Sequence, residues 1–186
     1  MKLRLCLGVL FWIFLLSAIS VSCASAPSEP ISLALFTENY VEVSIYLEGD
    51  SAGNYFLSAK FTPPEGYHLY SKDIPITGVN GLGRPTLLEL TIDSQMKAIG
   101  ELTESMKAQK PDFEPKELLV YPLGAVTLSL PVELPSGNSW VDDTIKVTFM
   151  ACSASQCKSP VVGKIVSIRI PGVDVLDIIN GRETKK

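Results

Sequence analysis

The chain has 186 residues, of which 46% are hydrophobic and 19% are charged, and its formal net charge is −4 at pH 7. This length fits one domain with an ordinary hydrophobic core. A mildly acidic chain without a basic patch argues against a nucleic-acid-binding protein and against electrostatic binding to anionic membrane surfaces.

The N-terminus has the layout of an export signal. Two basic residues are followed by an apolar run without charge at residues 5–16 and by small, weakly polar residues at 17–24. The run is shorter than the roughly 20 residues that a membrane-spanning helix needs. We therefore expect a signal peptide over residues 1–24 and a single exported domain over residues 25–186.

The processing of this signal has three alternatives. Ser22-Cys23-Ala24 carries small residues at the positions that a signal peptidase reads. The same region resembles a lipoprotein processing box, in which the signal would be residues 1–22 and Cys23 would carry the lipid. An uncleaved signal would instead anchor the chain in the membrane. All three predict a protein of the periplasm or another extracytoplasmic space, where contact with the membrane is limited to such an anchor.

Strands are expected where hydrophobic and polar residues alternate, at residues 31–36, 40–47, 55–61, 87–92, 118–121, 125–132, 144–149 and 164–170. Segments rich in Gly, Pro and Asn separate many of them. Residues 96–110 show neither strand nor helix periodicity clearly and are either a short helix or an ordered loop. The one plausible helix is at residues 173–179. This series of short strands predicts an all-β fold, an antiparallel β-sandwich.

Cleavage of the signal leaves Cys152 and Cys157 as the only cysteine pair, in a compartment that permits disulfides. They lie between the strands expected at 144–149 and 164–170, which a short loop would join into a β-hairpin. Residues that flank such a loop face each other, and in a non-hydrogen-bonded pair their Cα atoms are about 4.5 Å apart, near enough for a disulfide. The bond would be either a structural staple or a redox-active pair.

The small size of the loop favours the redox-active alternative. Closing about six residues stabilises a fold by roughly 2 kcal/mol in the chain-entropy model, against about 4 to 5 kcal/mol for a loop near a hundred residues. A bond placed for stability would therefore join more distant strands. In favour of a staple, most paired cysteines in exported proteins are structural.

Three segments resemble the N-terminal periplasmic domain of the thiol:disulfide interchange protein DsbD. They are the motif Met150-Ala-Cys-x4-Cys with a proline nearby, residues 65–77 (EGYHLYSKDIPIT) and residues 83–90 (GRPTLLEL). The resemblance spans roughly residues 32–170. It implies an immunoglobulin-like β-sandwich that carries a redox-active dithiol and needs no cofactor. One departure is that a single proline, Pro160, follows the second cysteine, where family members often have two.

The resemblance also implies roles for the two cysteines. In the family the second cysteine forms the mixed disulfide with a partner, so Cys157 would attack and Cys152 would resolve. The implied partners are thioredoxin-fold proteins. The chain ends at Lys186, before the transmembrane and C-terminal domains of full-length DsbD would begin. The resemblance therefore implies a stand-alone module that draws electrons from a separate membrane protein.

By the same resemblance, a cap loop with an aromatic residue shields the pair. The candidate is residues 111–114 (PDFE), with Phe113 as the cap and Asp112 beside it. Tyr67 and Tyr70 would lie near the cysteines. Lys158 follows Cys157 and either lowers the pKa of that thiol by favouring its charged form or is an ordinary solvated charge.

Other chemistries lack residues in this sequence. His68 is the only histidine, so a serine triad or a zinc site built from several imidazoles is disfavoured, and we expect no metal site. His68 is expected to be a strand residue that flanks the aromatic pair. The alternative to an exchange module is a non-enzymatic immunoglobulin-like binding or scaffold module, in which the Cys152–Cys157 disulfide is structural.

Overall fold

The computed structural model describes residues 29–179, in which antiparallel strands dominate. The expected signal peptide and the lipid site at Cys23 lie outside the described residues. Within residues 29–179, no helix has the length and apolar character needed to cross a membrane.

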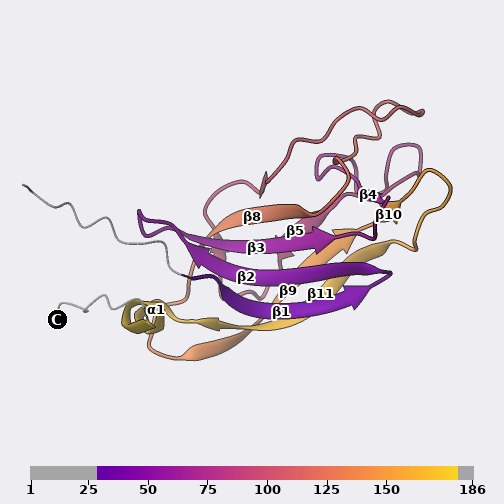
Figure 1. The fold of residues 1–186 in the computed structure, drawn as a ribbon. Coiled ribbons are helices and arrows are strands. Elements are labelled where there is room, and N and C mark those ends of the chain that lie inside the picture. The colour runs from indigo at the N-terminus through magenta and orange to yellow at the C-terminus, as the bar shows by residue number, and fades with distance from the viewer. Residues whose placement is uncertain (1–28, 180–186) are drawn as a thin grey trace, which may run out of the picture.

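The protein is an antiparallel β-sandwich, as predicted (Figure 1). The strands of the first sheet, in sheet order, are β1 (Ile31–Glu38), β2 (Val41–Gly49), β3 (Tyr55–Thr62) and β8 (Val126–Glu133), with the short β6 (Lys97–Ala98) and β7 (Thr103–Glu104) both paired to β8. The strands of the second sheet are β11 (Val161–Pro171), β9 (Trp140–Phe149) and β5 (Leu87–Leu90). A third, two-stranded sheet joins β10 (Ala151–Cys152) to β4 (His68–Leu69).

The core forms because alternate residues of both sheets point inward. Val43 and Ile45 of β2 and Ile145 of β9 have no exposed surface. The rings of Phe61 and Phe149, from opposite sheets, lie 5.6 Å apart in the same core. Burial of each such side chain stabilises the fold by about 1.5–3 kcal/mol. This main core contains neither cysteine.

Most of the predicted elements are confirmed, and α1 (Val173–Ile179) has the bounds expected from the sequence. The strand predicted at residues 118–121 is wrong. This segment is irregular, with only isolated bridges from Val120 to Tyr70 and to Gln109. Its apolar residues are buried in two different places, since Tyr121 belongs to the main core and Val120 to a smaller cluster. A segment that buries apolar side chains in two clusters can show the same sequence pattern as a strand.

Residues 96–110 form an ordered loop, which was one of the two alternatives expected from the sequence, and they contain no helix. They run along β8 and pair with it briefly through β6 and β7. The side chain of Met96 is buried in the main core. An edge segment of this kind needs no regular period, which explains why the sequence showed none.

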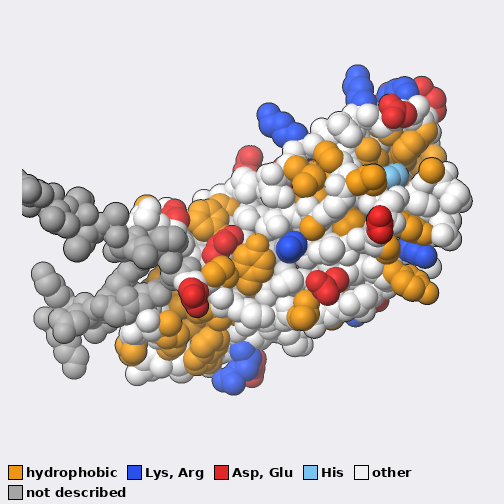
Figure 2. Space-filling view, in the orientation of Figure 1, with side chains coloured by type: hydrophobic (Ala, Val, Ile, Leu, Met, Phe, Trp, Pro, Cys, Tyr) orange, Lys and Arg blue, Asp and Glu red, His pale blue; other side chains and the backbone are white. Residues whose placement is uncertain are grey.

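The short sheet of β4 and β10 lies at one end of the sandwich, and α1 lies at the other (Figure 1). Both cysteines are at the β4–β10 end, because β10 directly continues β9. Hydrophobic side chains gather on the surface at this end, around the pale-blue histidine (Figure 2). This end of the sandwich is the candidate functional site.

Candidate functional site

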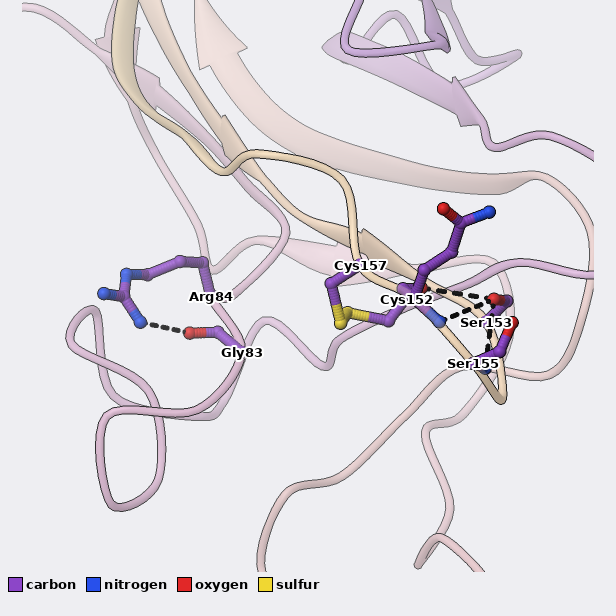
Figure 3. Close-up of a disulfide and its surroundings, with 7 residues drawn as sticks. Gly83, Arg84, Cys152, Ser153, Ser155 and Cys157 are labelled. Atoms are coloured by element: carbon purple, nitrogen blue, oxygen red, sulfur yellow. Dashed lines mark hydrogen bonds between the residues drawn. A yellow bond between two sulfur atoms is a disulfide. The ribbon is translucent and has the colours of Figure 1, made fainter.

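Cys152 and Cys157 form a disulfide, with an S–S distance of 2.00 Å and a Cα–Cα distance of 4.0 Å (Figure 3). The two residues face each other as an isolated antiparallel bridge. The N–H of Lys158 donates to the carbonyl of Ala151 at 2.8 Å, on one side of the pair. On the other side of the pair, the N–H of Ser153 donates to the carbonyl of Gln156. The pair is therefore of the non-hydrogen-bonded kind expected from the sequence.

The loop between the cysteines is a tight turn organised by Ser153. The N–H of Ser153 donates to the carbonyl of Gln156 at 2.8 Å. The Ser153 hydroxyl donates to the same carbonyl and accepts from the N–H groups of Ser155 and Gln156 (Figure 3). A serine side chain at the start of a turn commonly bonds to the backbone that follows. Ser153 thereby holds Cys157 opposite Cys152.

The two cysteines differ sharply in exposure. Cys152 is 2% exposed, whereas Cys157 is exposed to solvent. Cys152 is one of a small group of buried residues that is separate from the main core. We call this group the second cluster; its members are Tyr70, Ile74, Leu118, Val120 and Cys152. The Cys157 half of the disulfide is thus accessible from solvent, and the Cys152 half is buried in the second cluster.

Tyr70 belongs to the second cluster together with Cys152. It is 4% exposed, and burial raises the pKa of its hydroxyl. Its carbonyl accepts bonds from both the N–H and the hydroxyl of Thr86. A Cβ on Gly83, which has φ of +70°, would lie 3.1 Å from the Tyr70 ring and 2.7 Å from Leu118. Glycine at position 83 therefore lets the backbone lie directly on the ring.

Arg84 stabilises the loop that precedes this contact. Its Nη1 donates to the carbonyls of Thr77, Gly81 and Gly83, which draws the turn of residues 77–83 together. The bond to Gly83 is drawn in Figure 3. Arg84 was not among the site residues expected from the sequence. A positive charge close to several glycine carbonyls was the available signal.

His68 lies on the other side of Cys152 from Cys157. In the β4–β10 sheet, His68 is the register partner of Cys152. Its ring meets Tyr70 edge-on at 5.3 Å and stacks on Phe113 at 6.0 Å. Burial lowers the pKa of His68, and its Nε2 atom is buried without a hydrogen-bond partner among the described residues.

Phe113 therefore reaches the site through His68. Its ring is 43% exposed and is stacked on the imidazole of the residue paired with Cys152. Asp112, its predicted companion, is exposed and makes no hydrogen bond or ion pair within residues 29–179. The structure thus brings Phe113 to the site and leaves Asp112 on the surface.

Lys158 and Tyr67 form a separate contact on the Cys157 side. The Lys158 ammonium lies 5.1 Å from the centroid of the Tyr67 ring and 4.3 Å from that of Tyr40. A cation over an aromatic ring gains about 0.5–1 kcal/mol at an exposed site. Lys158 is therefore held between two rings and is not a freely solvated charge.

Asn39 and Tyr40 are site residues that the sequence analysis missed. They form the tight turn between β1 and β2, with φ values of 48° and 67°. The Asn39 side chain donates to the carbonyl of Ser159 at 2.8 Å, which ties this turn to the segment after Cys157. An Asn between two alternating segments is a turn signal. The contact between Asn39 and Ser159, which lie 120 positions apart in the sequence, is visible only in the folded chain.

No protein family model matches the chain, and no curated protein does. Among solved structures, the chain is similar to the N-terminal domain of DsbD from Neisseria meningitidis in the reduced form. The identity is 15%, the match covers 62% of this chain and 76% of that one, and the TM-score is 0.39. The resemblance is one of fold.

Proposed function

We propose that this chain is an extracytoplasmic thiol–disulfide exchange module that relays electrons between thioredoxin-fold proteins through Cys152 and Cys157. The observation that carries the proposal is the unequal exposure of the pair, with Cys157 open to solvent and Cys152 buried in the second cluster. A disulfide exchanges only when a thiolate can reach one of its sulfurs. The exposed residue offers that access, and the buried one is protected from outside attack.

The proposed exchange runs in two steps. The Cys157 thiolate of the reduced module attacks a disulfide of the partner, a mixed disulfide forms, and one partner sulfur leaves as a thiolate. Cys152 then loses its proton and attacks the Cys157 sulfur, which releases the second partner thiolate. The module ends as the disulfide, and the partner gains two electrons and, after protonation, two thiols. The reverse sequence reloads the module from a reduced donor.

Two surrounding groups would tune these steps. The Lys158 ammonium follows Cys157 in the chain and is restrained by Tyr40 and Tyr67. A fixed positive charge near a thiol favours the thiolate, the form that attacks. Phe113 would shield the pair from unproductive reaction, since it stacks on the residue next to Cys152.

The first test is the reduction potential of the pair, measured by equilibration with glutathione buffers. The full chain should carry Cys6→Ser and Cys23→Ser, which remove the thiols outside the pair. We expect a potential of roughly −180 to −270 mV, the range of working exchange proteins. A potential well below about −300 mV would instead indicate a structural bond, and a binding or scaffold module would then be the better description.

Trapping distinguishes the two cysteines. In the same background, Cys152→Ala should accumulate a mixed disulfide between Cys157 and a thioredoxin-fold protein. Cys157→Ala is the matched control, since it also lacks the disulfide but leaves only the buried thiol. Equal trapping by both variants would contradict the assigned roles.

A further inference from the structure

Three residues form a row across the end of the sandwich. Cys152 in β10 faces Cys157 on one side and His68 of β4 on the other. Directly opposed residues of antiparallel strands project their side chains from the same face of the sheet. The imidazole of His68 therefore stands on the face that carries both cysteine side chains, with Cys152 in the middle.

The spacing in this row places His68 within reach of Cys152. Because Cys152 and Cys157 are a non-hydrogen-bonded pair, the peptide groups of Cys152 point to β4, which makes Cys152 and His68 the hydrogen-bonded kind of pair. Such pairs have Cα atoms about 5.5 Å apart. Two side chains at that spacing on one face are neighbours.

The state of the His68 imidazole is unusual for a buried polar group. Its Nε2 is buried and has no hydrogen-bond partner among residues 29–179. Buried polar atoms without a partner are rare in folded proteins, because each costs about 1–3 kcal/mol. The rings of Tyr70 and Phe113 hold the imidazole in place. The ring is therefore fixed beside Cys152 with one nitrogen unused.

In the oxidised state, Cys152 offers Nε2 no hydrogen-bond donor. A disulfide sulfur carries no proton, whereas a cysteine thiol is a weak S–H donor and a neutral imidazole has one acceptor nitrogen. Reduction of the bond would create a donor on Cys152, the register partner of His68. The structure, in which the pair is oxidised, shows the state that lacks this donor.

We propose that His68 is the proton acceptor for the thiol of Cys152. In the reduced module Nε2 accepts the S–H of Cys152. During resolution it takes that proton as the Cys152 sulfur attacks Cys157, so the Cys152–Cys157 bond forms as the bond from Cys157 to the partner breaks. The partner thiolate leaves with the electron pair, and the imidazolium then returns its proton to that thiolate or to water.

This inference rests on the proposed exchange function and adds a base to its second step. It also explains how a thiol as buried as Cys152 becomes a nucleophile, since burial in apolar surroundings disfavours the thiolate. The charged residues on the segments that pack around His68 are Asp112 and Glu114, which flank Phe113, and Lys158, which follows Cys157. Nε2 is in contact with none of them by hydrogen bond.

A direct test uses the fact that His68 is the only histidine of the chain. Its ring nitrogens therefore give a single set of NMR signals, which can be recorded for reduced full-length chain in the Cys6→Ser, Cys23→Ser background. Cys152→Ala and Cys157→Ala both abolish the disulfide, but only the first removes the proposed donor. We expect the Nε2 resonance to show an accepted hydrogen bond in the reduced parent and in Cys157→Ala, and to lose it in Cys152→Ala.

Kinetics provide the second readout. His68→Phe keeps a flat ring against Tyr70 and Phe113 but removes the acceptor. In the preformed mixed disulfide of Cys157 with glutathione, it should slow release of glutathione by about 10²-fold, the lower range of a general-base effect. The parent rate should fall as the pH drops below 6.5 and His68 becomes protonated, since burial lowers its pKa from that value. His68→Phe should not show this fall in rate at low pH.

The outcomes separate the two proposals. An Nε2 signal that is identical in reduced Cys152→Ala and Cys157→Ala overturns the role of His68, whatever the reduction potential is. Equal release rates and pH profiles for the parent and His68→Phe overturn it as well, while leaving the exchange function intact. A reduction potential typical of a structural bond removes the exchange function, and the NMR comparison would still report whether the thiol and the imidazole interact.

Discussion

At the scale of single residues, the site depends on a few side chains with restricted surroundings. Gly83 permits contact between the backbone and the Tyr70 ring, and Tyr70 in turn covers Cys152. His68 is the register partner of the same cysteine, and its ring meets that of Tyr70. These three residues lie 69 or more positions before Cys152 in the chain, so a local motif cannot contain them.

Replacing Gly83 with alanine should destabilise the protein. The added Cβ would lie 2.7 Å from the Leu118 side chain at a positive φ, so strain and overpacking combine to about 2 kcal/mol or more. Urea unfolding of the oxidised chain measures the change. Gly81→Ala is the matched control, because Gly81 also has a positive φ but nothing within 4 Å of its Cβ position. Equal effects of the two variants would contradict the packing argument.

At the scale of elements, the site is assembled from segments that are attached to the sandwich at separate points. The turn between β1 and β2 is bonded to Ser159 through Asn39. The segment after β4 is attached through Tyr121, whose hydroxyl donates to Glu104 at 2.6 Å and accepts from the N–H of Lys72 at 3.1 Å. These contacts hold the irregular loops in the positions that the cysteines require.

The Tyr121 contact predicts a loss of stability at high pH. Burial, with the bond to Glu104, raises the pKa of Tyr121 well above its ordinary value of 10. Since the folded state holds the proton more tightly than the unfolded state, this contribution is complete below pH 10 and is lost as the pH rises above it. Unfolding measured between about pH 9 and 11 should show this decline. It should be smaller in Tyr121→Phe, and an unchanged slope in that variant would exclude Tyr121 as the cause.

At the scale of the whole molecule, the disulfide is peripheral to what holds the sandwich together. The main core lies between the two large sheets, and Cys152 belongs to the second cluster at one end. The cysteines close a very short loop, with a sequence separation of 5. Neither cysteine belongs to the main core, so opening the bond would leave the contacts of that core in place.

Removal of the bond should therefore cost little stability. Cys152→Ala combined with Cys157→Ala should lower the free energy of unfolding by about 2 kcal/mol, the value for so short a loop. Circular dichroism should still show a folded β-protein, and urea unfolding should give the change in free energy. An unfolded double variant would show that the bond is a structural staple.

The sequence predicted the sandwich because its signal is local. Alternation of apolar and polar residues directly reports which face of a strand is buried, and the strands at 41–49 and 55–62 were found in this way. The same rule failed at residues 118–121, where an irregular segment buries its apolar side chains in two clusters. Periodicity records burial, and it does not record the hydrogen bonds that define a strand.

By itself, the sequence determined the class of fold, the short helix and the pairing of Cys152 with Cys157, because each follows from residues close together in the chain. Only the tertiary structure decided that Cys157 is exposed and Cys152 buried, and that His68 lies beside Cys152 with an unused nitrogen. Exposure and side-chain neighbours depend on how distant segments pack, and a linear pattern carries no measure of those distances. The features from which we infer the chemistry are therefore properties of the folded protein.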